Sequence, residues 1–142
     1  MTIEAYVNFN GDCREAVDFY ADVFGTEKPQ IMTFGEMPAN PEFPISEEVK
    51  DLVMHTNLTI TGSRIMFSDV PPGMPFVQGN NISLTVISGN KEYLTNAFEK
   101  LREGGKVEME LQETFWSKCY GYLIDKFGIG WQLSYDEGKT EV

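Results

Sequence analysis

The chain of 142 residues contains one histidine, two cysteines and half as many basic as acidic residues, and each shortage excludes a class of protein. Eleven Lys and Arg against 22 Asp and Glu leave a net charge of -11, which repels nucleic-acid backbones and anionic lipid surfaces. We therefore expect no nucleic acid and no membrane among its partners. No stretch approaches the roughly 18 to 20 uninterrupted apolar residues of a membrane span, and the N-terminus lacks the basic and apolar regions of a signal peptide. These absences predict a cytoplasmic protein.

The two cysteines, Cys13 and Cys119, are far apart in the sequence and match no metal-binding spacing. Without a secretion signal, both are expected to be reduced thiols. Cys13 falls in the first turn of a predicted helix, where the helix dipole can lower the pKa of a thiol. A nucleophilic Cys13 is therefore the alternative to an inert one.

The chain contains the same supersecondary pattern twice. Residues 3–9 alternate as a strand, residues 13–24 have the spacing of an amphipathic helix that stops at Gly25, and strands are predicted at 28–34, 53–61 and 64–68. The order repeats with a strand at 82–87, a helix at 91–102 and strands near 106–111, 120–124 and 130–135. A repeated unit of this size buries its apolar face only by packing with further structure. We predict a first βαβββ module over 1–70, a proline-rich linker over 71–80, a second module over 81–135 and a polar tail over 136–142.

Local signals refine this prediction. Asp12 precedes the first helix and Glu15 follows three residues later, which is the spacing of a capping box. Prolines in residues 35–44 predict an irregular loop, and residues 61–63 predict a tight hairpin. Arg64 is expected to pair with Asp69 or with a nearby glutamate.

Several motifs resemble one family. They are the stretch from Glu15 to Gly25 in the first helix, Val53-Met54-His55, residues 62–69, Glu113-Thr114-Phe115-Trp116, Tyr120-Gly121, and Asp125-x-Phe127-Gly128-x-x-Trp131-Gln132-Leu133. Over residues 1–135 the chain resembles the PhnB-like, or 3-demethylubiquinone-9 3-methyltransferase-like, group of the vicinal oxygen chelate superfamily, which includes glyoxalase, bleomycin-resistance and extradiol dioxygenase proteins. The resemblance implies an α+β fold of tandem βαβββ modules forming a curled mixed-sheet cup, with the helices on the outer face, and it implies a homodimer.

The same resemblance predicts where a metal would be bound. Metal-dependent members of the superfamily use His, Gln or Glu on the first and last strands of each module, and a divalent cation needs about three such ligands and an open position. The matching positions here are Tyr6 or Asn8, Met66 or Ser68, Ser83 or Thr85, and Gln132 or Ser134. None is an imidazole or a carboxylate, so we predict no metal and no other cofactor.

Two sets of residues are candidates for a site. His55 is the one candidate catalytic residue, as a general base or proton shuttle, against the alternative of a strand-end histidine bonded to backbone or water. The predicted ligand-binding residues combine large aromatic side chains with polar residues of the inner strands: Tyr6, Asn8, Asn57, Met66, Ser68, Phe115, Trp116, Tyr120, Tyr122 and Gln132.

Three functions remain open on the sequence. The first is a metal-free protein that binds an unidentified small apolar or aromatic molecule. The second is a lyase, isomerase or dioxygenase of the superfamily that uses His55 or a weakly held metal. The third is an interaction module whose cup is filled by side chains. Methyl transfer is disfavoured, because the glycine-rich strand-to-helix turn and doubly wound sheet that usually hold a methyl donor are missing from the pattern.

Overall fold

The computed structural model describes residues 1–42 and 44–138. They divide into two compact units, the first over Met1–Val77 and the second beginning at Gln78. The first unit contains β1 (Ala5–Phe9), α1 (Cys13–Phe24), β2 (Met32–Thr33), the 3-10 helix η1 (Phe34–Glu36), β3 (Val53–Ile60) and β4 (Ser63–Asp69). Its strands form a sheet in the order β1-β4-β3-β2. β1 is parallel to β4, and the other pairs are antiparallel, so the sheet is mixed.

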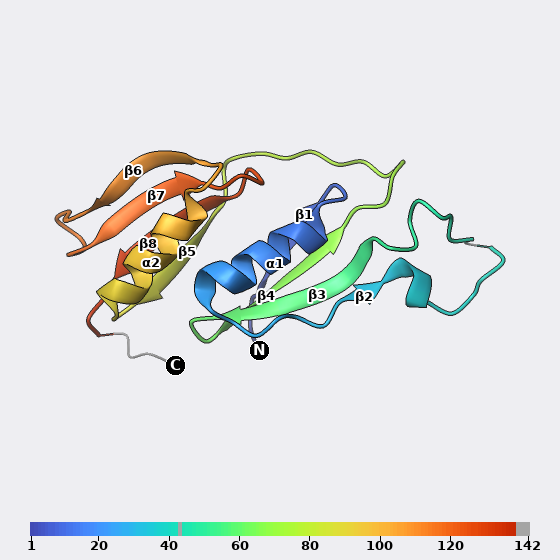
Figure 1. Cartoon of the computed structure of the whole chain (residues 1–142), viewed down its shortest axis with the longest axis horizontal. Coiled ribbons are helices and arrows are strands. Elements are labelled where there is room, and N and C mark those ends of the chain that lie inside the picture. Colours follow the sequence, from blue (N-terminus) through green and yellow to red (C-terminus); the bar gives the residue numbers. More distant parts are fainter. Residues whose placement is uncertain (43, 139–142) are drawn as a thin grey trace. The chain divides into compact units, whose positions relative to one another are not determined.

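Helix α1 lies across one face of this sheet (Figure 1) and packs against β3 and β4. Its apolar stripe is buried, with Val17 and Tyr20 at 0% exposure, and Tyr20 contacts the buried Phe67 of β4. Gly25 ends the helix in the left-handed conformation, which glycine adopts without steric cost. No helix in the described part of this unit covers the opposite face of the sheet.

The predicted capping box at the start of α1 is wrong. Asp12 occupies the cap position, but its side chain accepts no hydrogen bond from the helix. Asp69, 56 residues beyond Cys13 along the chain, accepts the N–H groups of Gly11 and Cys13 through Oδ1 at 2.9 and 3.0 Å. Its Oδ2 accepts the N–H of Val53 at 2.9 Å. A buried carboxylate at the end of β4 therefore joins the helix to the sheet.

Two other local predictions, the strand over 28–34 and the start of β1, need correction. The strand expected over 28–34 is reduced to β2, because the chain turns at once into η1, where Glu36 accepts the Thr33 N–H at 2.6 Å. Arg64 pairs with Glu4 at 2.7 Å, which confirms the glutamate alternative, and Asp69 is engaged by backbone groups. β1 starts at Ala5, two residues later than predicted. The hairpin over 61–63 is present, with positive φ at Thr61 and Gly62.

The second unit repeats the arrangement. It contains β5 (Ser83–Ser88), α2 (Lys91–Leu101), β6 (Lys106–Gln112), β7 (Tyr120–Ile124) and β8 (Gly130–Tyr135), in the sheet order β5-β8-β7-β6. β5 is parallel to β8, and β6, β7 and β8 are antiparallel. The side chain of Asn90 caps α2 by accepting the N–H of Tyr93 at 3.0 Å.

The core of the second unit lies between α2 and one face of its sheet. Trp131 of β8 is completely buried there, and its indole N–H donates to Oδ2 of Asp125 at 2.8 Å. Oδ1 of Asp125 accepts the N–H groups of Phe127 and Ile129, which closes the turn between β7 and β8. Gly121 of β7 faces the helix, where an added Cβ would lie 2.8 Å from the ring of Phe98.

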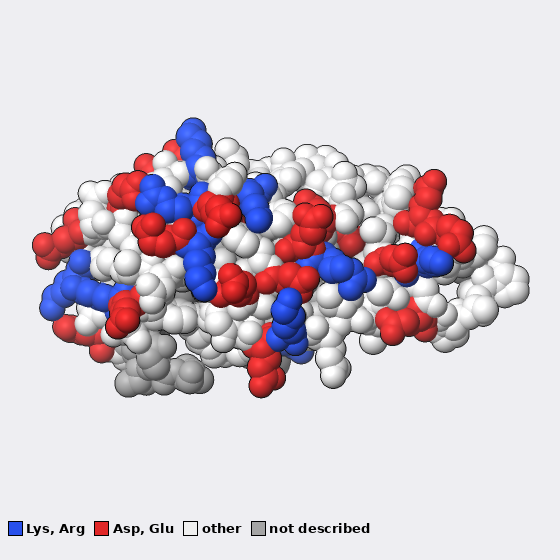
Figure 2. Space-filling view, in the orientation of Figure 1, with Lys and Arg blue, Asp and Glu red and all other residues white. Residues whose placement is uncertain are grey.

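The predicted α+β fold of two βαβββ modules is confirmed. In the described residues, no helix is both long and apolar enough to span a bilayer. Figure 2 shows basic and acidic side chains interspersed on the face of the second unit that carries α2. There the bidentate pair of Arg102 with Glu110, at 2.7 Å, is one example.

Candidate ligand-binding site

The site residues predicted in the first unit share the sheet face that α1 leaves uncovered. The register pairs Tyr6 with Met66 and Met66 with Asn57, so these three lie side by side across β1, β4 and β3. Asn8 pairs with Ser68, and the Ser68 hydroxyl donates to Oδ1 of Asn8 at 3.1 Å. This face therefore offers amide, hydroxyl and thioether groups.

His55 of β3 belongs to the same face, because it alternates with the buried Thr56. Its Nδ1 lies 3.3 Å from the Tyr6 hydroxyl, and the two rings are 5.8 Å apart. The histidine thus has a side-chain partner on a neighbouring part of the sheet. This contact brings together two residues that the sequence predicted separately.

The second unit carries the other predicted residues. Tyr120 and Tyr122 of β7 alternate with the buried Gly121 and Leu123, so their side chains project from the face opposite α2. The register places Tyr122 beside Gln132 of β8. The predicted ligand-binding residues are therefore divided between the two compact units, and within each unit those that lie on strands share one face of the sheet.

A chain of hydrogen bonds fixes Gln132 on this face. The Tyr120 hydroxyl donates to Oε1 of Gln132 at 2.6 Å, and Nε2 of Gln132 donates to the Ser83 hydroxyl of β5 at 2.8 Å. Burial, followed by repulsion from Tyr122, raises the pKa of Tyr120 above its usual value. The phenol is therefore held protonated as a donor, and the orientation of the amide is set by both of its neighbours.

Phe115 and Trp116 project from a tight turn between β6 and β7. Thr114 and Ser117 close this turn: the Thr114 N–H donates to the Ser117 carbonyl at 2.8 Å, and the Ser117 N–H donates to the Thr114 hydroxyl at 3.2 Å. The aromatic pair stands at the tip, with Phe115 96% and Trp116 55% exposed. Trp116 packs edge-on against Tyr120, with 5.2 Å between ring centroids, so the exposed pair is continuous with the network at Gln132.

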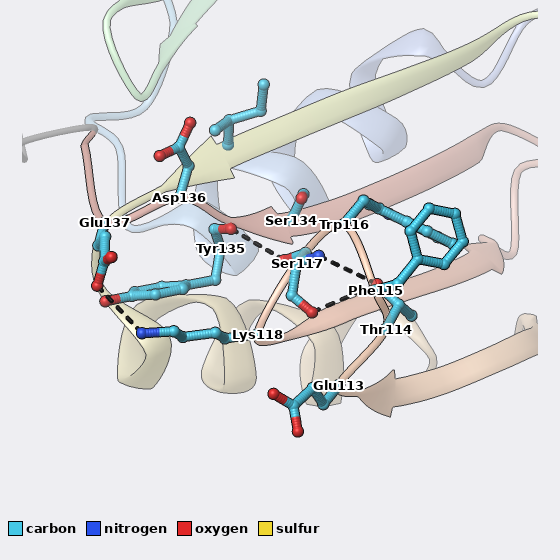
Figure 3. Close-up of a pocket in the computed structure, with 11 residues that line it drawn as sticks. Glu113, Thr114, Phe115, Trp116, Ser117, Lys118, Ser134, Tyr135, Asp136 and Glu137 are labelled. Carbon is cyan, nitrogen blue, oxygen red and sulfur yellow. Dashed lines mark hydrogen bonds and ion pairs between the residues drawn. The ribbon is translucent and has the colours of Figure 1, made fainter.

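An open hollow of about 430 Å³ lies between this turn and the end of β8 (Figure 3). Trp116 and Ile87 give it apolar surface, and its size falls in the range of about 300 to 1,000 Å³ that is usual for small-molecule sites. Ser134 lines it and pairs with Tyr120 in the sheet, which connects the hollow to the hydrogen-bonded network. The other lining residues are Glu113, Thr114, Phe115, Ser117, Lys118, Tyr135, Asp136 and Glu137.

Sequence reasoning did not assign several of these residues to a site. The Thr114-x-x-Ser117 spacing is a local turn signal that could have indicated an exposed Phe115 and Trp116. Asp136 and Glu137 were assigned to a polar tail, of which residues 139–142 lie outside the described part of the chain. Their place beside the hollow depends on the Ser117 hydroxyl, 2.9 Å from the Tyr135 carbonyl, and no sequence pattern indicates that contact.

Residues 1–134 match the family model of 3-demethylubiquinone-9 3-methyltransferase. The chain belongs to this family. Protein YjdN of Escherichia coli K12 is 34% identical over 141 residues, covering 94% of this chain and 95% of that protein. Protein PA1353 of Pseudomonas aeruginosa has a structure with a TM-score of 0.83 at 31% identity, covering 96% of this chain and 98% of that one. A PhnB protein of Bacillus cereus has a TM-score of 0.72 at 27% identity, covering 96% and 100%.

The family shares its fold with more distant proteins of the vicinal oxygen chelate superfamily. A glyoxalase/bleomycin resistance protein/dioxygenase family enzyme of Burkholderia phytofirmans PsJN has a TM-score of 0.59 at 18% identity, covering 92% of this chain and 96% of that one. At this identity the likeness concerns the fold alone. The match to the family model and the likeness to the Bacillus cereus PhnB protein confirm the resemblance to the PhnB-like group that was inferred from the motifs.

The donors at the positions where the resemblance predicts metal ligands do not fit a divalent cation. Oε1 of Gln132 already accepts the short hydrogen bond from Tyr120, and Oδ1 of Asn8 accepts one from Ser68. Among residues 1–42 and 44–138, no group of three or more His, Cys, Asp or Glu side chains could hold a metal ion. Hydroxyl, thioether and engaged amide groups bind Zn²⁺, Mn²⁺ or Ni²⁺ weakly. That the protein works without a metal stays a prediction.

Cys13 does not support the nucleophilic alternative. Its side chain is completely buried, and this burial, together with the nearby carboxylates of Asp69 and Asp12, raises the thiol pKa to about 12. This rise in the thiol pKa outweighs the lowering expected from the helix dipole. The described structure therefore gives Cys13 a packing role.

Proposed function

We propose that this protein binds a small aromatic molecule without a metal, on the open face of its second sheet. The observation that carries the proposal is the position of Trp116. This side chain is half exposed beside a hollow of about 430 Å³ and is continuous through Tyr120 with a fixed polar network. Large aromatic residues that stay exposed next to a hollow and a few oriented polar groups are typical of small-molecule sites.

The network supplies both a hydrogen-bond donor and a hydrogen-bond acceptor to such a ligand. The Ser83 hydroxyl, which accepts from Gln132, still has a proton to donate, and the Tyr120 oxygen can accept a hydrogen bond. Because these groups are held by each other, little side-chain entropy is lost when a ligand binds. Sequestration of this kind needs no acid, base or metal.

Binding can be tested by calorimetry and thermal shift with planar bicyclic aromatic molecules, using quinoline and its charged derivatives as probes. A ligand of the folded state raises the melting temperature. We expect Trp116→Ala to weaken binding about tenfold, which corresponds to about 1.4 kcal/mol, and Trp116→Phe to weaken it less. Met74→Ala, an exposed residue of the other unit, is the matched control. Unchanged binding in Trp116→Ala, or no binding by any probe to the wild type, would refute the proposal.

A second candidate is an enzyme of the superfamily that uses His55. The contact of 3.3 Å between Nδ1 of His55 and the Tyr6 hydroxyl favours it, because a neutral imidazole there can exchange a proton with the phenol or with a ligand. The test is mass spectrometry of a bound probe after incubation. A chemical change that disappears in His55→Gln would favour the enzyme, and an unchanged probe would favour simple binding.

We do not propose methyl transfer, although the family's description names it. Both sheets are mixed, and the turns that lead into α1 and α2 are short segments with one glycine each, whereas a methyl-donor site usually needs a glycine-rich turn in a parallel sheet. Calorimetric titration with S-adenosylmethionine is expected to give no heat of binding. Saturable binding would reverse this conclusion.

A further inference from the structure

We infer that the aromatic ligand of the second unit carries a positive charge. This inference rests on the proposed function and adds the charge class of the ligand. Its basis is the combination, in one hollow, of an exposed indole and an uncompensated set of carboxylates. The sequence did not indicate this combination, because the acidic residues come from two separate segments, the β6–β7 loop and the chain beyond β8.

Among the described residues that line the hollow, the charges do not balance. Three carboxylates, Glu113, Asp136 and Glu137, face one ammonium group, that of Lys118. The ammonium is already paired with Glu137 at 3.3 Å, as Figure 3 shows. Glu113 and Asp136 remain as net negative charges on opposite sides of the hollow. A cation that enters gains attraction from both, and an anion meets repulsion from both.

Trp116 adds a second attraction for a cation. The face of an indole carries negative charge density, and tryptophan is the strongest cation–π partner among the aromatic residues. Phe115 packs edge-on against Trp116, with centroids 4.8 Å apart and an interplanar angle of 86°. A planar cationic ring stacked on Trp116 would therefore gain both aromatic contact and charge stabilisation.

The two sides of the hollow are held in place before a ligand arrives. The Ser117 hydroxyl lies 2.9 Å from the carbonyl oxygens of both Cys119 and Tyr135, so the turn that carries Trp116 is tied to the end of β8. The N–H of Tyr135 also donates to the carbonyl of Cys119 at 2.8 Å. Ser117 is buried, which protects these bonds from water. A site that is already formed loses little entropy on binding.

The experiment compares three probes that share one ring system: N-methylquinolinium, quinoline and quinoline-2-carboxylate, titrated calorimetrically at pH 8 and low salt. We expect N-methylquinolinium to bind at least fivefold more tightly than quinoline, and quinoline-2-carboxylate to bind most weakly. The preference for the cation should shrink as salt is raised, because the carboxylates are exposed and screened.

Variants that replace one carboxylate with an amide show which residues cause the preference for the cation. Glu113→Gln and Asp136→Asn should each lower the affinity for N-methylquinolinium about two- to fivefold, a larger loss than the one for quinoline, which has no charge for the carboxylates to attract. Asp136→Asn keeps the oxygen that accepts the N–H of Gly138 at 2.9 Å, so the local turn is preserved. Both variants leave the pair of Lys118 with Glu137 intact.

Glu103→Gln is the matched control, since it removes the same charge elsewhere on the unit. Lys91, at the start of α2, lies over the ring of Tyr135 at 5.1 Å, and Glu103 follows the other end of this 11-residue helix. At 1.5 Å per residue the two ends are roughly 16 Å apart. Affinity for the cation should not change in Glu103→Gln.

Each outcome decides the question. Tighter cation binding that depends on Glu113 and Asp136 supports the inference. Equal or tighter binding of quinoline or its carboxylate overturns the inference and leaves the proposed function standing, as does a cation preference that persists in both variants. Absence of binding by all three probes overturns the proposed function and this inference with it.

Discussion

The hydroxyl of Tyr120 lies 2.6 Å from Oε1 of Gln132, and this contact links the aromatic side of the site to its polar side. Gln132 occupies a position where the superfamily resemblance predicts a metal ligand. Here its oxygen accepts a hydrogen bond from a phenol whose pKa is raised by burial. The same residue position therefore serves a hydrogen-bonded network in this chain.

Tyr120→Phe should lower the free energy of unfolding by about 1 kcal/mol, the typical net value of one intramolecular hydrogen bond. Trp116 still packs on the remaining ring, so little else changes. Urea unfolding at pH 8 measures the difference. A loss near zero would mean that water replaces the phenol at Gln132 without cost.

The same variant should alter the response to alkaline pH. The folded-state pKa of Tyr120 is raised above that of the unfolded chain, about 10. Its contribution to stability is therefore fully present below pH 10 and is lost as pH rises through the folded-state pKa. The wild type should lose more stability than Tyr120→Phe above pH 10. Parallel stability curves for the two proteins would contradict this expectation.

Asp69→Asn should destabilise the protein by about 2 kcal/mol or more, because an amide keeps one acceptor oxygen and turns donors toward buried N–H groups. The N–H groups at risk are those of Gly11, Cys13 and Val53. Asp12→Asn is the matched control and should cost less than about 1 kcal/mol, since only a helix-dipole contribution is lost. Denaturant unfolding of both variants provides the measurement, and equal losses would contradict the long-range cap.

Cys13 should resist alkylation in the folded protein, and Cys119 should react first. Cys13 is fully buried with a pKa of about 12, whereas Cys119 is partly exposed. Reaction with iodoacetamide at pH 8, followed by peptide mass spectrometry, distinguishes the two thiols. Rapid labelling of Cys13 in the absence of denaturant would show that α1 opens readily.

The two tryptophans should differ sharply when replaced. Trp131→Phe should cost about 3 kcal/mol, because it leaves a cavity and removes the hydrogen bond of 2.8 Å to Asp125. Trp116→Phe should cost less than about 1 kcal/mol, because its side chain is half exposed. Chemical unfolding compares them. A large loss in Trp116→Phe would mean that Trp116 is a packing residue, against the proposed function.

Local patterns were sufficient for most of the secondary structure. The helix over 13–24 and the hairpin at 61–63 depend on side-chain periodicity and turn chemistry within a few residues. The prediction of a strand over 28–34 was wrong because of another local interaction. Thr33 and Glu36 form a capping interaction that starts η1 and ends the strand early. One local signal favours a strand over 28–34 and the other, the Thr33–Glu36 interaction, favours a helical turn, and alternation alone does not show which of the two forms.

The candidate site was predictable only in part. The family resemblance predicted site positions at Tyr6 or Asn8, Met66 or Ser68, and Gln132 or Ser134. The register places Tyr6 beside Met66 in the first sheet and Gln132 beside Tyr122 in the second. The sequence did not indicate that Tyr120 binds Gln132, or that Tyr6 contacts His55 across 49 positions of the chain. These contacts depend on strand order and register, which alternation within one strand does not specify.

By itself, the sequence determined the repeated βαβββ order and the acidic surface, because each follows from residue type and spacing along the chain. It also showed that imidazole and carboxylate side chains are missing at the metal positions that the family resemblance implies. The tertiary structure alone decided that Asp69 caps α1 and that Ser117 joins the turn carrying Trp116 to the end of β8, beside Asp136. The physical reason is that such contacts join groups distant in sequence, and the free energy that selects them comes from packing the whole unit.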